Sequence, residues 1–406
     1  MTALLLCLLV LPLLLPGFAL LLLTMAALLP ARHRAWLPTA MPAAAPRVVV
    51  LVPAHNESAH LLPTLRSLQA QIGRGNQALV VADNCSDDTA ALARQAGAGV
   101  VERTDPLRRG KGYALACGID QLRADPPDVV VVIDADCLPD PGAVADLAER
   151  CHTLQRPVQL LNLMASPDGA PLRIRVAEFA MVMKNLVRPL GTQRLGGVCH
   201  LSGTGMALPW ALAATARLAT GHVAEDMALG VDLARAGRGP VFLPTARIRS
   251  SFVANPAVVR VQKARWEHGH LDTLRSQLPG LLRDTLRQRS RTVAALALDL
   301  CIPPVALYAS VLTGLLAAVA AAAWFWPAAR PAAALAASGA GALVLAVLLG
   351  WWHHGRHLLR AGHLLRLPLY ALWKLPVYLA YASGRRSGWV RTQRAVTAGQ
   401  AGVTAP

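Results

Sequence analysis

The feature that most limits how this chain can fold is a nearly continuous apolar run over residues 3–29. Two further runs cover residues 304–326 and 332–352, and each ends with two tryptophans. A helix needs about 20 apolar residues to cross the hydrocarbon core of a bilayer, and tryptophan is common where such a helix meets the interface. The first run is longer than a signal-peptide core and no basic residue precedes it, so we expect an anchor rather than a cleaved signal. The length of the runs argues against buried core helices, which are the alternative.

Basic residues around these runs predict how the chain crosses the membrane. The link at 327–331 carries only Arg330, whereas the outer flanks of the second and third runs are rich in arginine. Cytoplasmic loops are enriched in Lys and Arg, so both outer ends of this hairpin are expected in the cytoplasm. We therefore expect a multi-pass protein of the bacterial inner membrane with its soluble part in the cytoplasm. The residues that support this orientation are Arg32, His33, Arg34, Arg283, Arg287, Arg289, Arg291, Arg356, Arg360 and Arg366.

The segment 367–384 is also apolar, but it is short and contains Lys374. We expect an amphipathic helix that lies at the membrane interface rather than a fourth span. Anionic lipids would then attract the basic tail, which carries Arg385, Arg386, Arg391 and Arg394.

The composition fits a membrane protein, because 54% of the residues are hydrophobic and only 16% are charged. The formal net charge is +17, and nearly all of the basic residues are arginine. Such a charge can attract nucleic acid, anionic lipid or an anionic substrate such as a diphosphate. The chain has no zinc-finger spacing, aromatic RNA-binding signature or basic-helix motif, so no nucleic-acid partner is expected. The seven cysteines are dispersed without a CxxC pair, which predicts reduced thiols.

Residues 46–290 have a different texture, in which short β-branched runs alternate with helical patterns. Uniformly apolar strands that alternate with helices predict an α/β domain with a parallel sheet covered on both faces. Ligands bind such sheets beyond the carboxyl ends of the strands, so the residues after each strand are expected to carry the chemistry. We expect strands at 47–53, 78–82, 99–102 and 128–134, and helices at 56–71, 87–96 (with Ser86 as N-cap) and 111–123.

Acidic side chains follow three of the expected strands, in the segments PAHNE (53–57), DNCSD (83–87) and DAD (134–136). Asp134 and Asp136 can hold a divalent ion, because Mg²⁺ takes one or two protein carboxylates together with phosphate oxygens. The alternative is that both are solvated surface acids. The apolar strand expected directly before the pair argues against that alternative.

Two other residues near these strand ends allow two interpretations each. Asp83 can accept hydrogen bonds from a base or a ribose, or it can form a turn. Lys111, in the segment RRGKG, can meet a phosphate or remain solvated at a helix end.

Two later motifs add a candidate base and a candidate binding surface. Glu225 and Asp226 either begin a helix, where its dipole favours acids, or supply a general base for an acceptor hydroxyl. Gln262, Arg265 and Trp266 can bind a sugar and a diphosphate, or they belong to an amphipathic helix on the membrane.

In this order the motifs resemble the membrane-bound branch of the family-two glycosyltransferases, whose catalytic domain has a GT-A fold. Enzymes of bacterial exopolysaccharide assembly are the most similar group, and cellulose and hyaluronan synthases are more distant. One departure is Ala224, where the family usually has Thr before Glu-Asp. The resemblance covers residues 46–275 and is carried by VVVLVPAHNE, VVADNCSDDTA, RGKGYAL, VVVIDAD, HLSGTGMALP, VAEDMALG and QKARW.

The resemblance implies a role for each candidate residue. Asp226, with Glu225 beside it, would be the base of an inverting displacement on a nucleotide sugar, which is expected to be UDP-linked. Asp134 and Asp136 would bind the donor with Mg²⁺ or Mn²⁺, and Asp136 would hold the metal. The remaining donor-side residues would be Ala54, Glu57 and Asp83 around the base and ribose, and Lys111 near the nucleotide. The acceptor and pyrophosphate side would consist of Gly203, Thr204, Gln262, Arg265 and Trp266.

The expected enzyme is a hexosyltransferase that serves exopolysaccharide biosynthesis, acts on a lipid-linked or growing saccharide and works with other polysaccharide-export proteins. A processive polysaccharide synthase is an alternative, since Gln-x-x-Arg-Trp is typical of processive enzymes, whereas the short membrane part favours single additions. A catalytically inactive membrane scaffold is the alternative from another class. The expected parts are a span at 1–30, a catalytic domain at 46–290, a transmembrane hairpin at 292–352, and an interfacial helix and tail at 353–406.

Overall fold

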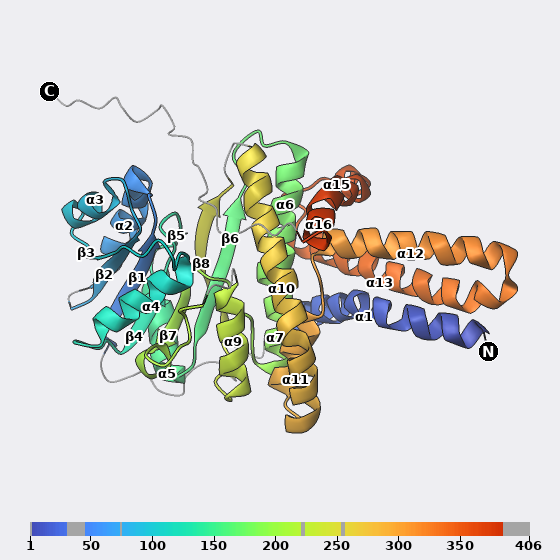
Figure 1. Cartoon of the computed structure of the whole chain (residues 1–406), viewed down its shortest axis with the longest axis horizontal. Helices are drawn as coiled ribbons and strands as arrows, with labels where there is room; N and C mark the ends of the chain where they lie inside the picture. The colour runs from blue at the N-terminus through green and yellow to red at the C-terminus, as the bar shows by residue number, and fades with distance from the viewer. Residues whose placement is uncertain (1, 31–44, 74, 221–223, 253–255, 385–406) are drawn as a thin grey trace.

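A computed structural model describes residues 2–30, 45–73, 75–220, 224–252 and 256–384, with the side chains of 256–261 excepted. The basic residues at 32–34 and the C-terminal tail, on which part of the predicted topology depends, fall outside this description. An α/β domain lies beside a bundle of three long helices that extends away from it (Figure 1).

The α/β domain contains one mixed sheet. Its strands are β1 (Val48–Ala54), β2 (Gln77–Asp83), β3 (Gly99–Arg103), β4 (Val129–Val132), β5 (Leu138–Pro139), β6 (Val158–Ala165), β7 (Met206–Pro209) and β8 (Val241–Ser251). Within the described residues their order is β3-β2-β1-β4-β7-β6-β8-β5. The half from β3 to β4 is parallel, as predicted, whereas β7 runs antiparallel to both β4 and β6. This mostly parallel α/β sheet confirms the predicted fold class and is typical of a GT-A domain.

Helices cover both faces of the parallel half because its strands are apolar throughout. Val50 of β1 belongs to a buried cluster with Leu65 and Leu147, whereas the neighbouring Leu51 packs with Leu115 on the other face. The helices of this domain are η2 (Ser58–Leu61), α2 (Leu62–Gln69), α3 (Thr89–Gln95), α4 (Lys111–Leu122), α5 (Ala143–Leu154), α6 (Leu172–Val182), η3 (Met183–Val187), α7 (Arg188–Gly196), α8 (Trp210–Ala213) and α9 (Glu225–Arg235).

The predicted N-cap at Ser86 is wrong. Helix α3 begins at Thr89 with Asp88 at the N-cap position. Ser86 lies in the preceding loop, where its backbone N–H donates to the side-chain oxygen of Asn56 at 2.7 Å. The first turn is instead supported by Asp87, whose carboxylate accepts from the backbone N–H of Thr89 at 3.1 Å.

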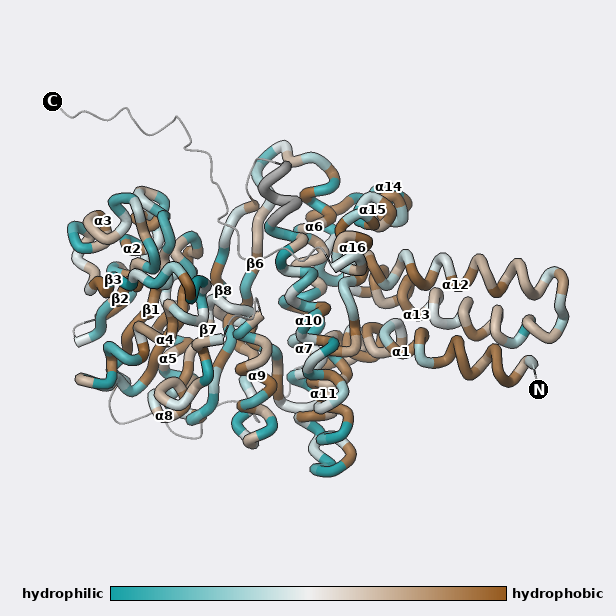
Figure 2. Tube along the Cα trace, in the orientation of Figure 1, coloured by the Kyte–Doolittle hydropathy of each residue, from teal (hydrophilic) through white to brown (hydrophobic). Residues whose placement is uncertain are grey.

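The three apolar runs form the helices α1 (Thr2–Leu28), α12 (Val305–Phe325) and α13 (Arg330–His354), the last two joined by η4 (Pro327–Ala329). In the described part of the chain, these are the helices long and apolar enough to cross a membrane. They pack side by side and are largely hydrophobic along their length (Figures 1 and 2).

A tyrosine hydroxyl joins two of these helices where α1 contains a proline. The backbone N–H of Gly17 donates to the Tyr308 hydroxyl at 3.0 Å, and that hydroxyl donates to the carbonyl of Leu13 at 3.1 Å. A regular helix would pair Gly17 directly with Leu13. The hydroxyl therefore offers a hydrogen-bond partner to both backbone groups, which hydrocarbon cannot do. Gly17 permits this approach, because a Cβ there would lie 2.8 Å from the Tyr308 oxygen and 3.0 Å from the carbonyl of Gly339.

Two helices, α10 (Pro256–Gln288) and α11 (Arg291–Leu300), run between the sheet and the bundle (Figure 1). Three short helices follow the bundle: α14 (Ala361–Leu364), α15 (Leu367–Trp373) and α16 (Leu375–Ala382). The segment 367–384 is thus two short helices rather than the single helix predicted. The break falls at Lys374, two residues before Pro376, which lacks a backbone donor and restricts the residue before it. Its position at a membrane interface stays a prediction.

Candidate active site

The carboxyl ends of β1, β2 and β4 open into one cavity of about 470 Å³, called here the polar cavity. All of the residues that were predicted to form a site line it, although they come from segments up to about half the chain apart. The structure thus brings these residues together in one cavity. These lining residues are Ala54, Glu57, Asp83, Lys111, Asp134, Asp136, Gly203, Thr204, Glu225, Asp226, Gln262, Arg265 and Trp266.

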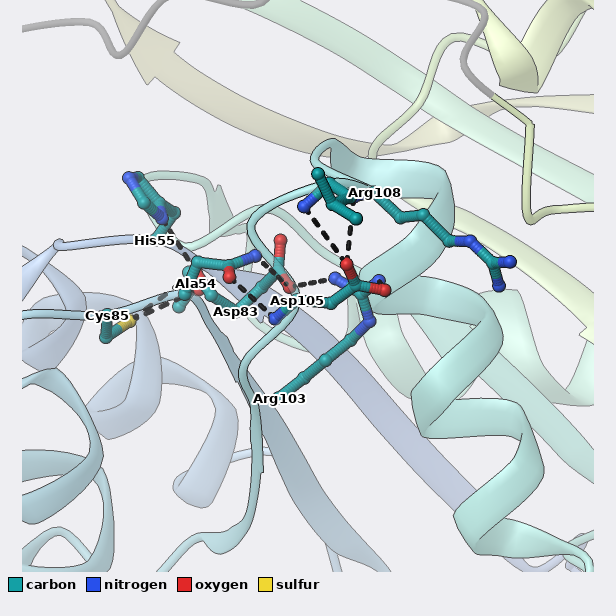
Figure 3. A network of polar contacts seen from close by, with 9 residues as sticks. Ala54, His55, Asp83, Cys85, Arg103, Asp105 and Arg108 are labelled. Carbon is teal, nitrogen blue, oxygen red and sulfur yellow. Dashed lines mark hydrogen bonds and ion pairs between the residues drawn. The ribbon is translucent and has the colours of Figure 1, made fainter.

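At one end of the polar cavity, Asp83 is held by an arginine that the sequence did not single out. Nη1 of Arg103 lies 2.6 Å from Oδ1 of Asp83, and both side chains are mostly buried. The same guanidinium contacts Asp105 at 3.1 Å and lies 5.5 Å from the centre of the Tyr113 ring. Figure 3 shows this network around the end of β2. The contact with Arg103 therefore fixes the Asp83 side chain at the cavity wall.

The loop after β1 is tied to the loop after β2. The backbone N–H groups of Glu57 and Ser58 donate to the hydroxyl of Thr89 at 2.9 and 2.8 Å. Nδ1 of His55 lies 2.6 Å from the carbonyl oxygen of Asp83 (Figure 3). These bonds fix the backbone next to Ala54 and Glu57, so two strand ends form one continuous wall.

Lys111 joins three segments at the centre of the polar cavity. Its ammonium forms an ion pair with Asp134 and donates to the carbonyl of Gly203 at 2.7 Å. A Cβ on Gly203, whose φ is +81°, would lie 3.1 Å from Oδ2 of Asp226 and 3.3 Å from Nζ of Lys111. Burial acts to lower the pKa of Lys111, but the carboxylates of Asp134, Glu225 and Asp226 outweigh burial and raise it. Lys111 is therefore charged and balances a cluster of acids.

The loop that carries Gly203 and Thr204 is held by Gln159, which was not predicted from the sequence. The buried Gln159 amide donates to the carbonyl of Thr204 at 2.8 Å and accepts from the backbone N–H of Ser202 at 2.9 Å. The hydroxyl of Thr204 accepts from the backbone N–H of Asp134 at 3.0 Å. Gln159 and Thr204 thus position the loop against the end of β4. A glutamine inside a strand carries no motif by which it could have been found.

Asp134, Asp136 and Cys137 bring one possible ligand atom each to within 4.8 Å of one another. Burial, reinforced by both carboxylates, raises the pKa of the Cys137 thiol, so the thiol stays protonated. The oxygen donors that remain are the two carboxylates, and hard ions such as Mg²⁺ prefer oxygen. The residues present therefore fit a hard divalent cation that takes its other ligands from a bound phosphate.

Glu225 and Asp226 form the first turn of α9 and face the polar cavity. Burial and the neighbouring Asp226 carboxylate raise the pKa of Glu225 to about 7. Burial also raises the pKa of Asp226, against the opposing effect of the Lys111 ammonium. Two adjacent acids with raised pKa values suit proton transfer near neutral pH.

Helix α10 brings Gln262, Arg265 and Trp266 to the same cavity. The Gln262 side chain is buried, and its Oε1 has no hydrogen-bond partner among the described residues. Burial lowers the pKa of Arg265, whereas Asp134 and Glu225 act to raise it, which places its charge near the acids. At these three positions the side chains of α10 thus line the polar cavity.

A buried cluster extends the polar cavity towards the membrane helices, and the sequence did not reveal it. Nε of Arg188 lies 2.6 Å from Oδ1 of Asp299, and Nε2 of His200 lies 3.4 Å from the other carboxylate oxygen. Burial would raise the pKa of Asp299, but Arg188 and His200 lower it. Burial lowers the pKa of His270, which also lines the cavity, to about 3, so this imidazole is neutral.

Known proteins resemble the chain in sequence and structure. Residues 46–269 match the family described as "Glycosyltransferase like family 2". A stretch of 100 residues is 40% identical to uncharacterized glycosyltransferases of Mycobacterium bovis and Mycobacterium tuberculosis and covers 25% of this chain and 41% of theirs. The match thus spans about two-fifths of the length of these curated relatives.

Two solved structures are similar in outline. One is a mannosyltransferase from Pyrobaculum calidifontis in complex with GDP-Man and Mn²⁺, with 18% identity over 84% of this chain and 99% of that chain, and a TM-score of 0.49. The other is glucosyl-3-phosphoglycerate synthase from Mycobacterium tuberculosis with Mn²⁺, UDP and glucosyl-3-phosphoglycerate, with 23% identity over 50% of this chain and 71% of that chain, and a TM-score of 0.33.

Proposed function

Because the chain belongs to the glycosyltransferase-like family 2, we propose that it is an inverting enzyme that moves a sugar from a nucleotide sugar, with UDP as the expected nucleotide, to a lipid-linked saccharide. The observation that carries the proposal is that the acids after β2 and β4, the acids that open α9 and the polar side chains of α10 all line one cavity. We place this domain at the cytoplasmic face of a bacterial inner membrane, in exopolysaccharide assembly.

The donor would occupy the end of the polar cavity at β1 and β2. Asp83, which Arg103 holds in place, would accept hydrogen bonds from the base or the ribose. Asp134 and Asp136 would hold Mg²⁺ or Mn²⁺, which neutralises charge on the leaving diphosphate. Arg265 would add a second positive charge beside the departing oxygen.

Asp226 would remove the proton from the acceptor hydroxyl. The acceptor oxygen then forms a bond to the anomeric carbon as the bond from that carbon to the diphosphate breaks, which inverts the configuration. The proton stays on Asp226, and the nucleoside diphosphate leaves with the electron pair. Lys111 supports this role, because its ammonium acts against the burial that raises the pKa of Asp226 and so favours the carboxylate that a base requires.

Replacement of the proposed base tests the assignment. In Asp226→Asn we expect sugar transfer to fall about 100-fold or more, because general base catalysis contributes on the order of 10²–10⁴. Nucleotide-sugar affinity, measured by equilibrium binding to the purified full chain, should change little. Asp232→Asn is the matched control, since Asp232 lies on the same helix and is exposed. Activity close to that of the unchanged enzyme in Asp226→Asn would refute the base assignment.

A donor screen separates the enzyme from an inactive scaffold. Membranes that contain the protein should release nucleoside diphosphate from one nucleotide sugar, and the purified protein should do so when lipid-linked acceptor is added. No turnover with any donor would favour the scaffold. Product length then separates single additions from a processive synthase, because a single-addition enzyme lengthens its acceptor by one sugar.

A further inference from the structure

A second cavity of about 670 Å³, called here the apolar cavity, lies where the α/β domain meets the bundle. Its walls come from α6, η3, α10, α12, α13 and α15, and most of its lining is apolar. The two cavities share five lining residues, namely Met181, Lys184, Arg188, Trp266 and His270. A volume of this size lies within the range of small-molecule sites, roughly 300–1,000 Å³. The apolar cavity therefore adjoins the polar cavity. Part of its wall is formed by α12 and α13, which are long enough to span the bilayer.

The lysines of this chain are all at these cavities. Arginine makes up nearly all of the positive charge, and the sequence contains lysine only at Lys111, Lys184, Lys263 and Lys374. Lys111 lines the polar cavity, Lys184 lines both, and Lys263 and Lys374 line the apolar cavity. An ammonium is a compact point charge on a flexible stem, which suits a phosphate that approaches from variable directions. All four lysines of the sequence therefore line one or both of the cavities.

Two of these lysines already have carboxylate partners. Lys111 pairs with Asp134, and Lys374 pairs with Glu267. Lys184 and Lys263 form no ion pair among the residues that the structure describes, and the Lys263 ammonium lies 5.2 Å from the centre of the Phe252 ring. Glu267 acts to raise the pKa of Lys184 and of Lys263. Burial outweighs this effect and lowers both pKa values, that of Lys263 to about 8. Among the described residues these two lysines thus have no carboxylate in direct contact, and both line the apolar cavity.

The backbone at Lys184 is unusual as well. Lys184 lies in η3, a π-helical turn between α6 and α7, and such turns are frequent at functional sites. The turn is fixed by Asn185, whose side chain donates to the carbonyl of Asn162 at 3.0 Å. Lys184 lines the polar cavity together with Asp226, and that carboxylate acts to raise its pKa. It therefore stands between the proposed base and the apolar wall.

We propose that the apolar cavity seats the hydrocarbon chain of a lipid phosphate or diphosphate, with its phosphate at Lys184 and Lys263. This inference rests on the proposed function, because the sugar carried by that lipid would then present its hydroxyl to Asp226. The membrane-spanning helices α12 and α13 form part of the wall, so the lipid can enter from the bilayer. A neutral lipid would bring no counter-charge to either ammonium, whereas a phosphate would offset the cost of removing them from water.

Binding measured without any nucleotide sugar tests the inference independently of catalysis. The full chain in a non-ionic detergent is titrated with a fluorescent polyprenyl phosphate, with the matching polyprenol and with inorganic phosphate. We expect the polyprenyl phosphate to bind about tenfold or more tightly than the polyprenol, because hydrogen bonds to charged groups contribute strongly when buried. Inorganic phosphate should not compete at equal concentration. Equal affinity for the polyprenol, or equal competition by phosphatidylglycerol, would overturn the proposal in favour of a site for ordinary lipids.

Variants separate the phosphate from the chain. Lys184→Met should weaken binding of the polyprenyl phosphate about tenfold and leave the polyprenol affinity unchanged, and Lys184→Arg should restore part of the preference. Lys263→Met gives a second test if Lys184→Met does not fold.

Gly314→Phe should weaken the binding of both ligands, since Gly314 lines the apolar cavity and a Cβ there meets nothing within 4 Å. Gly341→Phe is the matched control, because Gly341 has equal space and lines neither cavity. Equal effects of the two phenylalanines would refute the placement of the chain.

The two proposals fail in different ways. Phosphate-selective lipid binding without release of nucleoside diphosphate from any donor would keep the lipid site and refute the glycosyltransferase mechanism. Release of nucleoside diphosphate without phosphate-selective binding would refute the lipid site and keep the mechanism.

Discussion

The stability of this protein should be highly sensitive to the loss of either charge of the buried pair Arg188–Asp299. The side chains are 6% and 10% exposed, Nε and Oδ1 are 2.6 Å apart, and Nη2 of Arg188 donates to the backbone carbonyl of Asp299 at 2.8 Å. The pair joins the first turn of α7 to the end of α11. Removal of one partner leaves a buried charge uncompensated, which costs about 3–5 kcal/mol. Replacement of both by apolar residues of similar size is often close to neutral.

We therefore expect Arg188→Met and Asp299→Leu each to destabilise the protein strongly, and the double variant to recover most of the loss. In a domain of this class 1 kcal/mol moves the midpoint of unfolding by roughly 2–4 °C, so each single variant should lower it by about 6–20 °C. The assay is thermal unfolding in detergent. Unfolding is monitored through the reaction of a fluorogenic thiol reagent with buried cysteines, which include Cys199 and Cys301 near the pair.

The control is Asp120→Asn in the exposed pair Arg123–Asp120, which should leave the midpoint unchanged. A shift of less than about 2 °C in either single variant would refute the reasoning, since it implies less than about 1 kcal/mol. So would a double variant whose loss equals the sum of the two single losses, because that result shows no coupling between the charges.

Two further predictions concern the bundle and the acid pair. Tyr308→Phe removes the hydroxyl between Gly17 and Leu13 and should destabilise the protein by about 1 kcal/mol, measured as the loss in denaturation midpoint, whereas Ser338→Ala, which removes an exposed hydroxyl on α13, should have no effect. For Glu225, whose pKa rises from 4.5 to about 7 on folding, the folded state binds more protons than the unfolded state between these values. Its contribution to the free energy of unfolding is therefore complete below pH 4.5 and is lost as pH rises through about 7. Glu225→Gln should flatten this part of a calorimetric stability profile, and an unchanged slope would show that Glu225 does not titrate there.

Local sequence patterns were sufficient to predict the strands of the first half of the domain and the three long apolar helices. A continuous apolar strand such as β4 can be recognised because period and length are local properties, and the carboxyl ends of parallel strands must meet at one edge of the sheet. That rule alone predicts that Asp83, Asp134 and Asp136 lie close together. Helix ends were predicted less accurately. Ser86 and Asp88 are both good N-cap residues, and the sequence did not show that Ser86 lies in a loop that contacts Asn56.

Patterns within short stretches of chain were therefore enough to predict the three apolar helices, the parallel half of the sheet and part of the lining of the polar cavity. Packing between distant segments set the antiparallel β7, the supporting role of Gln159, and the pairs of Lys111 with Asp134 and of Arg188 with Asp299. Arg188 and Asp299 are 111 positions apart, and no periodicity links residues across such a distance. The apolar cavity likewise depends on tertiary structure: its walls come from helices in distant segments, and only their packing leaves a space beside Lys184 and Lys263.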